Sequence, residues 1–188
     1  MIFKEISFFK FRNKKFLTRC INKNDINDKY IKALSTKKFV RFNKKNKKTN
    51  YLKQSGYINE INKSKNKLLA GFFNKKKLIG TVGVQKISSR KYYIGILIFD
   101  FKFKGIGLSK VMLSIVGKIL KKNLDVSFLY ATVNKNNLKS HRLFKSLGFK
   151  KHKSHPKRYK SDVVYYINTE NLKKFLLKNQ LFKILKND

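Results

Sequence analysis

Two glycines stand at a place suited to phosphate binding. Gly105 and Gly107 follow an apolar run, Tyr92 to Phe99, whose β-branched and aromatic residues are typical of a buried strand. After them, apolar residues recur at helical spacing from Leu108 to Leu120. Because glycine has no Cβ, such a turn can point unpaired backbone N–H groups at one spot, where the helix dipole adds positive charge. Such a spot binds phosphate, but two glycines by themselves favour a plain turn before a helix, which would use them too.

Other reactive side chains give few signals. The histidines His141, His152 and His155 lack the spaced Cys, Asp or Glu companions that a zinc site requires, so we expect no metal. Cys20 is the single cysteine, which excludes an intrachain disulfide and favours a reducing compartment. Its strand-like neighbours place it in the core.

The length and hydropathy pattern predict one domain spanning residues 1–188. The chain is 41% hydrophobic, and no Pro- or Gly-rich linker divides it. We expect a core at about 16–167, followed by a basic amphipathic helix at 168–188. Charged residues interrupt the first eleven positions, and no apolar run approaches membrane-spanning length. These features predict a cytoplasmic protein.

The charge is strongly one-sided. The sequence has 47 Lys and Arg against 9 Asp and Glu, a net charge of +38, so anionic partners will be attracted. Non-specific binding of nucleic acid at low salt is expected from this charge alone. AT-rich codons would also yield abundant Lys, Asn, Ile and Phe, so drift in composition is favoured over selection for nucleic acid, although drift does not explain the shortage of carboxylates.

The first half of the chain predicts one strand, two helices and a basic loop. A strand is expected at about 15–21, and Asn24-Asp25 would cap a helix that carries Ile26, Tyr30, Ile31 and Leu34. Residues 36–50 are rich in Lys and Arg without an apolar period, which indicates a loop. Thr49 would cap the second helix. Its inner side is expected to carry Leu52, Tyr57, Ile58 and Ile61.

The second half predicts a mixed sheet. Strands at 68–73 and 78–84 form a hairpin, and the strand from Tyr92 pairs with it. The helix after Gly107 then crosses over, so the strand at 126–133 is parallel. A helix closed by Gly148, a strand at 163–167 and a closing helix with Leu172 through Leu185 complete the chain. The fold class is α/β (α+β), with a mostly antiparallel sheet and helices on both faces.

Two motifs in this order of elements resemble the GNAT acetyltransferase superfamily. The acyl-CoA signature stands as Lys102-Phe103-Lys104-Gly105-Ile106-Gly107, with Lys in place of the family's Arg or Gln. A second signature, Asn-x-x-Ser-x-x-Leu-aromatic-x-x-x-Gly-Phe, runs from Asn137 to Phe149. The resemblance covers about 16–166. It implies a GNAT fold whose central strands splay apart, from 129 to 131, to form an acyl-CoA slot.

The resemblance also implies a site for acetyl-CoA as co-substrate. Backbone N–H groups from 104 to 108 would hold the pyrophosphate, and the strand after Gly95 would pair with the pantetheine arm. Asn137 would hydrogen-bond along that arm, although it is also an ordinary helix cap. The implied cofactor residues are Ile96, Leu97, Ile98, Lys102, Lys104, Gly105, Ile106, Gly107, Leu108, Asn137 and Phe144.

The catalytic residues of the family are replaced here. Many relatives carry a Tyr that protonates the leaving thiolate, and the matching position is Phe144. Many also place a Glu on the strand before the glycines, where this chain has Tyr93. Chemistry and location leave Tyr93, His155 and Tyr159 as candidates for the base, each of which is also compatible with a packing or surface role.

The acceptor is expected to be a small amine, and an anionic one. The segments 16–19 and 30–34 look like those of GNATs that include sugar-amine acetyltransferases of surface-glycan pathways and ribosomal-protein N-terminal acetyltransferases. The basic stretch from Lys37 to Lys48 suits a diphosphate, which ranks a nucleotide-linked amino sugar first and a protein amine second. A non-catalytic nucleic-acid-binding protein on a GNAT scaffold is the alternative of another class.

Overall fold

A computed structural model describes residues 7–37, 39, 49–124, 126–153, 162–171 and 183–185. Its described strands form one sheet in the order β7-β8-β6-β5-β4-β3-β2-β1-β9. Among these strands, β5 and β6 are the parallel pair, and the other neighbours are antiparallel. The predicted mixed, mostly antiparallel sheet is therefore confirmed.

Three consecutive strands form the centre of the sheet. They are β3 (Lys67–Asn74), β4 (Lys77–Ser88) and β5 (Lys91–Ile98). Lys75 and Lys76 make the first tight turn with φ of 48° and 63°. These values lie in the left-handed region, which a two-residue hairpin of this twist requires at both positions.

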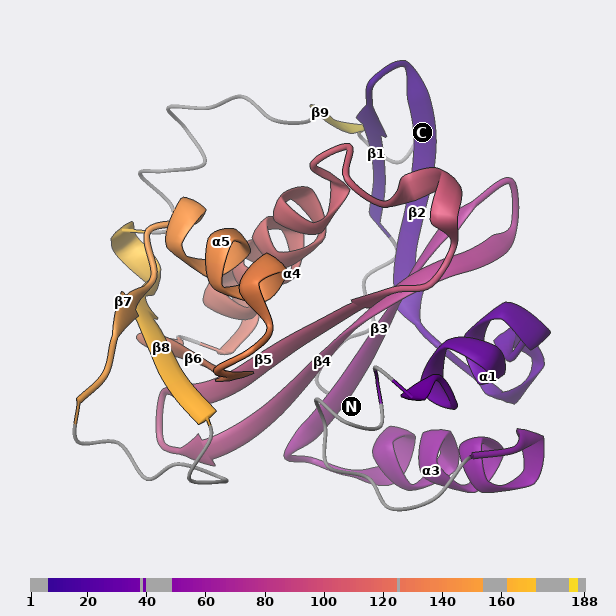
Figure 1. Ribbon diagram of the computed structural model, residues 1–188, viewed down its shortest axis with the longest axis horizontal. Coiled ribbons are helices and arrows are strands. Elements are labelled where there is room, and N and C mark those ends of the chain that lie inside the picture. The colour runs from indigo at the N-terminus through magenta and orange to yellow at the C-terminus, as the bar shows by residue number, and fades with distance from the viewer. Residues whose placement is uncertain are drawn as a thin grey trace.

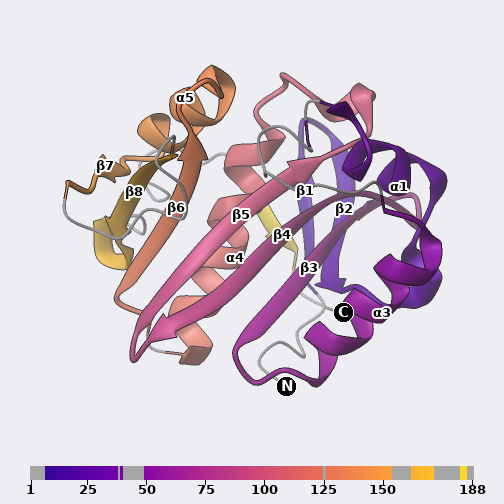
Figure 2. The same ribbon diagram turned by 60° about the horizontal axis from the view of Figure 1, so that its bottom comes forward.

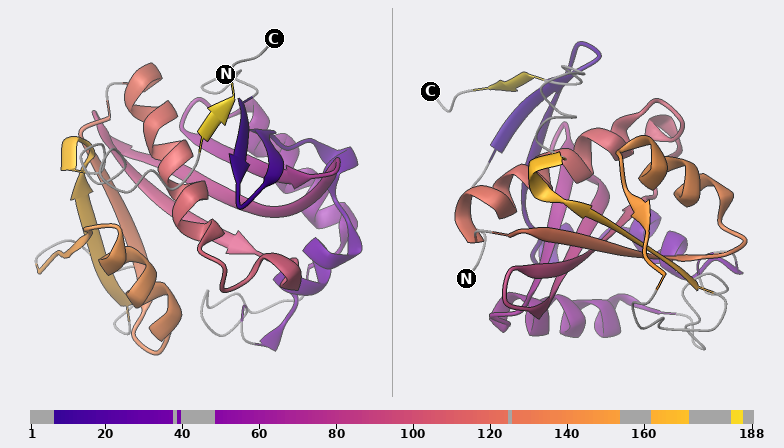
Figure 3. Two further views of the ribbon diagram at one scale, coloured as in Figure 1. Left: turned by 90° about the horizontal axis from the view of Figure 1, so that it is seen from above. Right: turned by 90° about the vertical axis from the view of Figure 1, so that its left-hand side faces the viewer.

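The crossover helix and its two flanking strands also follow the sequence. A short 3-10 turn, η2 (Phe101–Phe103), leads to α4 (Leu108–Leu124), which returns the chain to β6 (Phe128–Asn134). All residues of α4 from Val111 to Gly117 are buried, where the helix crosses the sheet (Figure 3). Because α4 is a crossover connection between β5 and β6, these two strands run parallel.

The second signature forms a capped helix. In α5 (Leu138–Ser146), the Asn137 side chain accepts a hydrogen bond from the Ser140 N–H, and Gly148 follows the helix with φ +82°. The chain continues as β7 (Lys150–Lys151) and β8 (Asp162–Asn168). Both ends of α5 therefore lie where the capping residues predicted.

The N-terminal elements differ from the prediction in detail. A hairpin of β1 (Ser7–Phe11) and β2 (Lys14–Cys20) precedes α1 (Asp28–Leu34), and β1 was not expected. The cap of α1 is Asn27 instead of Asn24-Asp25, because those two residues belong to the 3-10 turn η1 (Lys23–Asp25).

Helix α3 (Tyr51–Lys63) also starts one residue later than predicted. Its cap is Asn50 instead of Thr49, and the Asn50 side chain accepts a hydrogen bond from the Lys53 N–H. Ile58 and Ile61 are buried as expected, but Leu52 is 78% exposed and Tyr57 is 41% exposed. Gln54 takes an inner position instead, where it donates to the Tyr30 hydroxyl.

The predicted closing helix is wrong at its end. Lys183–Leu185 form β9, which pairs antiparallel with β1 and adds a strand to that edge of the sheet. Residues 172–182 and 186–188 lie outside the described part. An apolar residue every three or four positions suited a helix, but the free edge of β1 offered backbone partners that the sequence did not reveal.

Helices cover both faces of the sheet (Figures 1 and 3). One core joins α4 and α5 to the sheet, and a second joins α1 and α3 to the opposite face. On the second face, Tyr30 of α1 stacks on Phe99 with ring centroids 5.1 Å apart. This contact fixes α1 against the chain segment that leaves β5.

Candidate active site

The two parallel strands at the centre of the sheet separate. Pairing between β5 and β6 is confined to three residue pairs, which end at Tyr93 opposite Tyr130. Both strands then continue, β5 to Ile98 and β6 to Asn134, while their ends diverge (Figure 2). The splayed strands of the prediction are confirmed, and the separation begins after Tyr130, one or two residues later than expected.

A cavity of about 610 Å³ occupies this separation. Its lining comes from both faces of the sheet. Ile96, Val133 and Phe144 belong to the α4 and α5 side, whereas Gly95, Leu97 and Thr132 lie on the α1 side. The cavity is thus lined by residues of both faces of the sheet.

The structure brings most of the expected cofactor residues to this cavity. The lining includes Ile96, Leu97, Ile98, Lys102, Lys104, Asn137 and Phe144. The β5 backbone beyond Tyr93 has lost its pairing with β6, so that edge can pair with a ligand that carries amides. Asn137 lines the cavity and also caps α5, so its two expected roles are compatible.

The remaining expected residues form the turn into α4. Gly105 and Gly107 have φ of +80° and +91°, which residues with a side chain rarely adopt. Ile106 lies between them, and Leu108 begins α4 with its side chain buried. Both backbone positions therefore require glycine, and the turn places the N-terminus of a 17-residue helix near the cavity.

Phe144 lies in the hydrophobic wall of the cavity. It is 3% exposed and packs against Phe149 and Tyr165, at ring centroid distances of 5.1 and 6.3 Å. The Tyr165 hydroxyl is bonded to Nδ1 of His141, at 2.9 Å, so His141 secures α5 to β8. The ring of Phe144 is thus firmly placed but has no proton to donate.

The charge around the cavity is positive. Among its described lining residues Asp100 is the one acid, and Lys29 binds it at 2.9 Å. Burial disfavours the charged form of Asp100, but the hydrogen bonds from Lys29 and the Lys102 backbone outweigh it and lower the pKa of this carboxyl. The lining also contains the lysines Lys32, Lys102, Lys104 and Lys139.

Of the candidate bases, Tyr93 is described, whereas His155 and Tyr159 lie outside the described residues. Burial raises the pKa of Tyr93, and a hydrogen bond with Thr132 only partly offsets this effect. The hydroxyl therefore stays protonated near neutral pH, which suits a hydrogen-bond donor better than a base.

Some lining residues escaped the sequence analysis. Lys29, Lys32 and Ala33 reach the cavity from α1, and Thr132 reaches it from β6. Gly95 also lines it, and a Cβ added there would meet nothing within 4 Å. The alternation of strand residues was the one signal for Gly95 and Thr132, and it became usable only once the register was known. The basic stretch from 37 to 48 lies outside the described part except for Lys37 and Phe39.

The described part of the chain contains no group of three His, Cys, Asp or Glu suited to a metal ion. Cys20 is half-buried rather than fully in the core, and burial raises the pKa of its thiol to about 11. No helix among the described residues is both long and apolar enough to cross a membrane.

Comparison with known proteins places this geometry in a family. Residues 16–150 match the model of the acetyltransferase (GNAT) domain. An uncharacterized protein of Methanocaldococcus jannaschii is 35% identical over 95 residues, which are 50% of this chain but 19% of that longer protein. The chain therefore spans about a fifth of the length of this relative.

Two solved structures share the fold. RimJ of Mycobacterium smegmatis, in complex with CoA-disulfide, has a TM-score of 0.75 at 10% identity, with 95% of each chain covered. Spermidine N-acetyltransferase of Vibrio cholerae, in complex with CoA and spermine, has a TM-score of 0.71 at 16% identity, with 84% of this chain and 97% of that one covered. With its family match, its splayed strands and its glycine turn, the chain belongs to the GNAT acetyltransferase family.

Proposed function

We propose that the chain transfers an acetyl group from acetyl-CoA to an amino group of a nucleotide-linked sugar, in the synthesis of a surface glycan. The observation that carries this proposal is the charge of the cavity. Five lysines line it: Lys102 and Lys104 belong to the expected cofactor site and Lys29 is bonded to Asp100, so Lys32 and Lys139 add positive charge beyond these. A diphosphate fits such a lining, and a polycation does not.

Acetyl-CoA would enter from the α4 and α5 side. Its pyrophosphate would lie at the turn of Gly105 and Gly107, and its pantetheine amides would pair with the free edge of β5. The thioester would then lie beside Phe144, at the separation of the strands. Because a thiol pKa is about 8.5, CoA thiolate can leave at neutral pH without an acid at this position.

The acceptor amine would approach from the α1 side and attack the thioester carbonyl. It must lose a proton, and the positive surroundings lower the pKa of an acceptor ammonium, which raises its neutral fraction. The field of the lysines would therefore bind the diphosphate and assist deprotonation together. Tyr93 would donate a hydrogen bond near the reacting groups.

The test is an acetyl-CoA consumption screen with nucleotide-linked amino sugars, peptides with free N-termini and spermine. We expect turnover of the sugars. Lys32→Ser should raise the sugar's KM and reduce its dependence on salt, because Lys32 is an exposed cation that lines the cavity. Lys118→Ser on the exposed side of α4 is the matched control and should change neither property.

A second variant addresses the basic stretch from 37 to 48. Replacing Lys44, Lys45, Lys47 and Lys48 by Ser should also raise the KM of the sugar while acetyl-CoA binding stays nearly unchanged. Turnover confined to peptides would reject the sugar and support a protein N-terminal acetyltransferase.

A third assay separates both enzymes from a nucleic-acid-binding protein. Binding to DNA or RNA at low salt is expected from the net charge of +38, so only its behaviour at physiological salt is informative. We expect binding to be lost there for all sequences together. A preference that persists, with no turnover, would support the nucleic-acid alternative.

A further inference from the structure

Four rings lie together on the sheet, beside the cavity. Tyr93 of β5 meets Tyr130 of β6 at a centroid distance of 6.2 Å, and Tyr130 stacks on Tyr166 of β8 at 6.2 Å. His152, which follows β7, contacts Tyr130 at 5.9 Å and Tyr166 at 5.1 Å. We call Tyr93, Tyr130, Tyr166 and His152 the aromatic row.

Strand register places the aromatic row on the α1 side of the sheet. Tyr93 is paired with Tyr130, and Tyr130 with Tyr166, so the three tyrosines lie abreast on neighbouring strands. Their sequence neighbours Tyr92, Leu129 and Tyr165 point into the core beneath α4 and α5. Because strand residues alternate between faces, the aromatic row lies on the opposite side.

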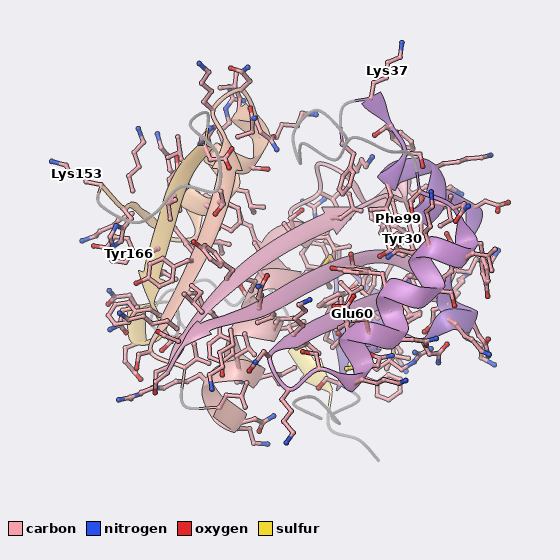
Figure 4. All side chains as sticks on the ribbon, turned by 90° about the horizontal axis from the view of Figure 1, so that it is seen from below. Tyr30, Lys37, Glu60, Phe99, Lys153 and Tyr166 are labelled. Atoms are coloured by element: carbon pink, nitrogen blue, oxygen red, sulfur yellow. The ribbon has the colours of Figure 1, made fainter. Side chains whose placement is uncertain are left out.

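The aromatic row begins where the cavity begins. The pair of Tyr93 and Tyr130 is the last one before the strands separate, and Tyr93 is hydrogen-bonded to the lining residue Thr132. Gly95, two residues further along the same face, leaves open space. Figure 4 shows Tyr166 at one side of this face, and Tyr30 of α1 and Lys37 at the other.

The two sides of this open face differ in chemistry. At one end of the face, helix α1 contributes Lys29 and Lys32 to the cavity lining. At the other end lie the half-buried rings of Tyr93 and Tyr166, with Tyr130, 5% exposed, between them. Burial raises the pKa of both Tyr93 and Tyr130, so their hydroxyls carry no charge near neutral pH. Tyrosine faces bind flat apolar groups and also cations, but the nearby lysines repel cations. The lysines of α1 and the tyrosine rings together favour a molecule with an anionic group and an uncharged ring.

We infer that the aromatic row holds the sugar ring that carries the acceptor amine, while the lysines of α1 hold its phosphates. The inference rests on the proposed function, and it adds which part of the acceptor each side of the face recognises. It makes the enzyme selective for a cyclic amine over a linear one, since a ring offers a flat C–H face to the tyrosines.

The experiment compares Tyr93→Leu and Tyr166→Leu with the wild-type enzyme on a nucleotide-linked amino sugar. Removing one ring should raise the acceptor KM about tenfold for Tyr93→Leu, from lost apolar burial and ring contact, and by less for Tyr166→Leu, two strands away. The calorimetric affinity for acetyl-CoA should not change in either variant. Tyr57→Leu, which removes an exposed tyrosine on α3, is the matched control.

The outcomes separate the two proposals. If the wild-type enzyme acetylates the sugar and neither Tyr93→Leu nor Tyr166→Leu changes the KM of the sugar, the inference is wrong and the proposed function stands. Acetylation of linear peptides alone would overturn both. Tyr93 and Tyr166 are both half-buried, so both variants are expected to fold, and Tyr166→Leu provides the test if Tyr93→Leu does not.

Discussion

The two faces of the cavity are built in different ways. The α4 and α5 face is formed mainly by Ile96 and Ile98, which lead into the glycine turn, and by residues 137–144, so neighbours in sequence are neighbours in space. The α1 face combines Lys29, Gly95 and Thr132 with an aromatic row that comes from four separate segments. Local backbone geometry governs the first face and strand register the second. Substitutions on each face should therefore affect different substrates.

The largest effect is expected at the glycine turn. Gly107→Trp forces a side chain onto a backbone with φ +91° and fills the space that a phosphate would approach. Losing two hydrogen bonds to a charged group should weaken acetyl-CoA binding by about 100-fold or more, as measured by calorimetry.

Gly148→Ala controls for backbone strain in that experiment. Gly148 has a similar φ of +82° but ends α5 and lies outside the cavity lining. The Gly148→Ala substitution should lower the melting temperature of the protein and leave its affinity for acetyl-CoA unchanged. If the Gly107→Trp variant binds acetyl-CoA with unchanged affinity, the phosphate site does not lie at this turn.

The next effect concerns how α1 is held. Tyr30→Phe removes the hydroxyl that accepts from buried Gln54, so we expect a loss of about 1–3 kcal/mol in the free energy of unfolding, measured in urea. Because α1 carries Lys29 and Lys32, loosening this helix should raise the KM of the acceptor while the affinity for acetyl-CoA stays unchanged. An equal loss of both affinities would mean that the two faces are not independent.

A smaller change is expected at Phe144. Phe144→Leu keeps an apolar side chain but loses the ring contacts with Phe149 and Tyr165, which should cost about 1 kcal/mol of stability. Turnover should stay within about tenfold of wild type, since this position transfers no proton. Steady-state kinetics would contradict this role if kcat fell by several orders of magnitude.

The smallest effect is expected at the exposed ion pair on the α1 face. Lys29→Met should reduce stability by less than about 1 kcal/mol at pH 7. The folded state lowers the pKa of Asp100, so its contribution is complete above the ordinary value of about 4 and disappears as the pH falls through the lower folded value. Unfolding curves should therefore differ at pH 7 and converge at low pH. A difference that grows in acid would contradict this sign.

The difference between the faces also explains what could be predicted from the sequence. The glycine turn, Asn137 and Gly148 carry their conformational reasons within a few residues, so the elements around them were predicted correctly. Tyr130 and Tyr166 are 36 positions apart in sequence, and only pairing in the sheet makes them neighbours. The same reason explains the missed β9, whose partner β1 lies at the other end of the chain.

The central claim is that the two substrates occupy opposite faces of the sheet. The most direct test is calorimetric titration of acetyl-CoA into a variant altered only on the α1 face, Lys32→Ser with Tyr166→Leu. We predict wild-type affinity for acetyl-CoA in this double variant, together with a raised acceptor KM. Loss of acetyl-CoA binding in the double variant, to the extent expected for Gly107→Trp, would contradict the account.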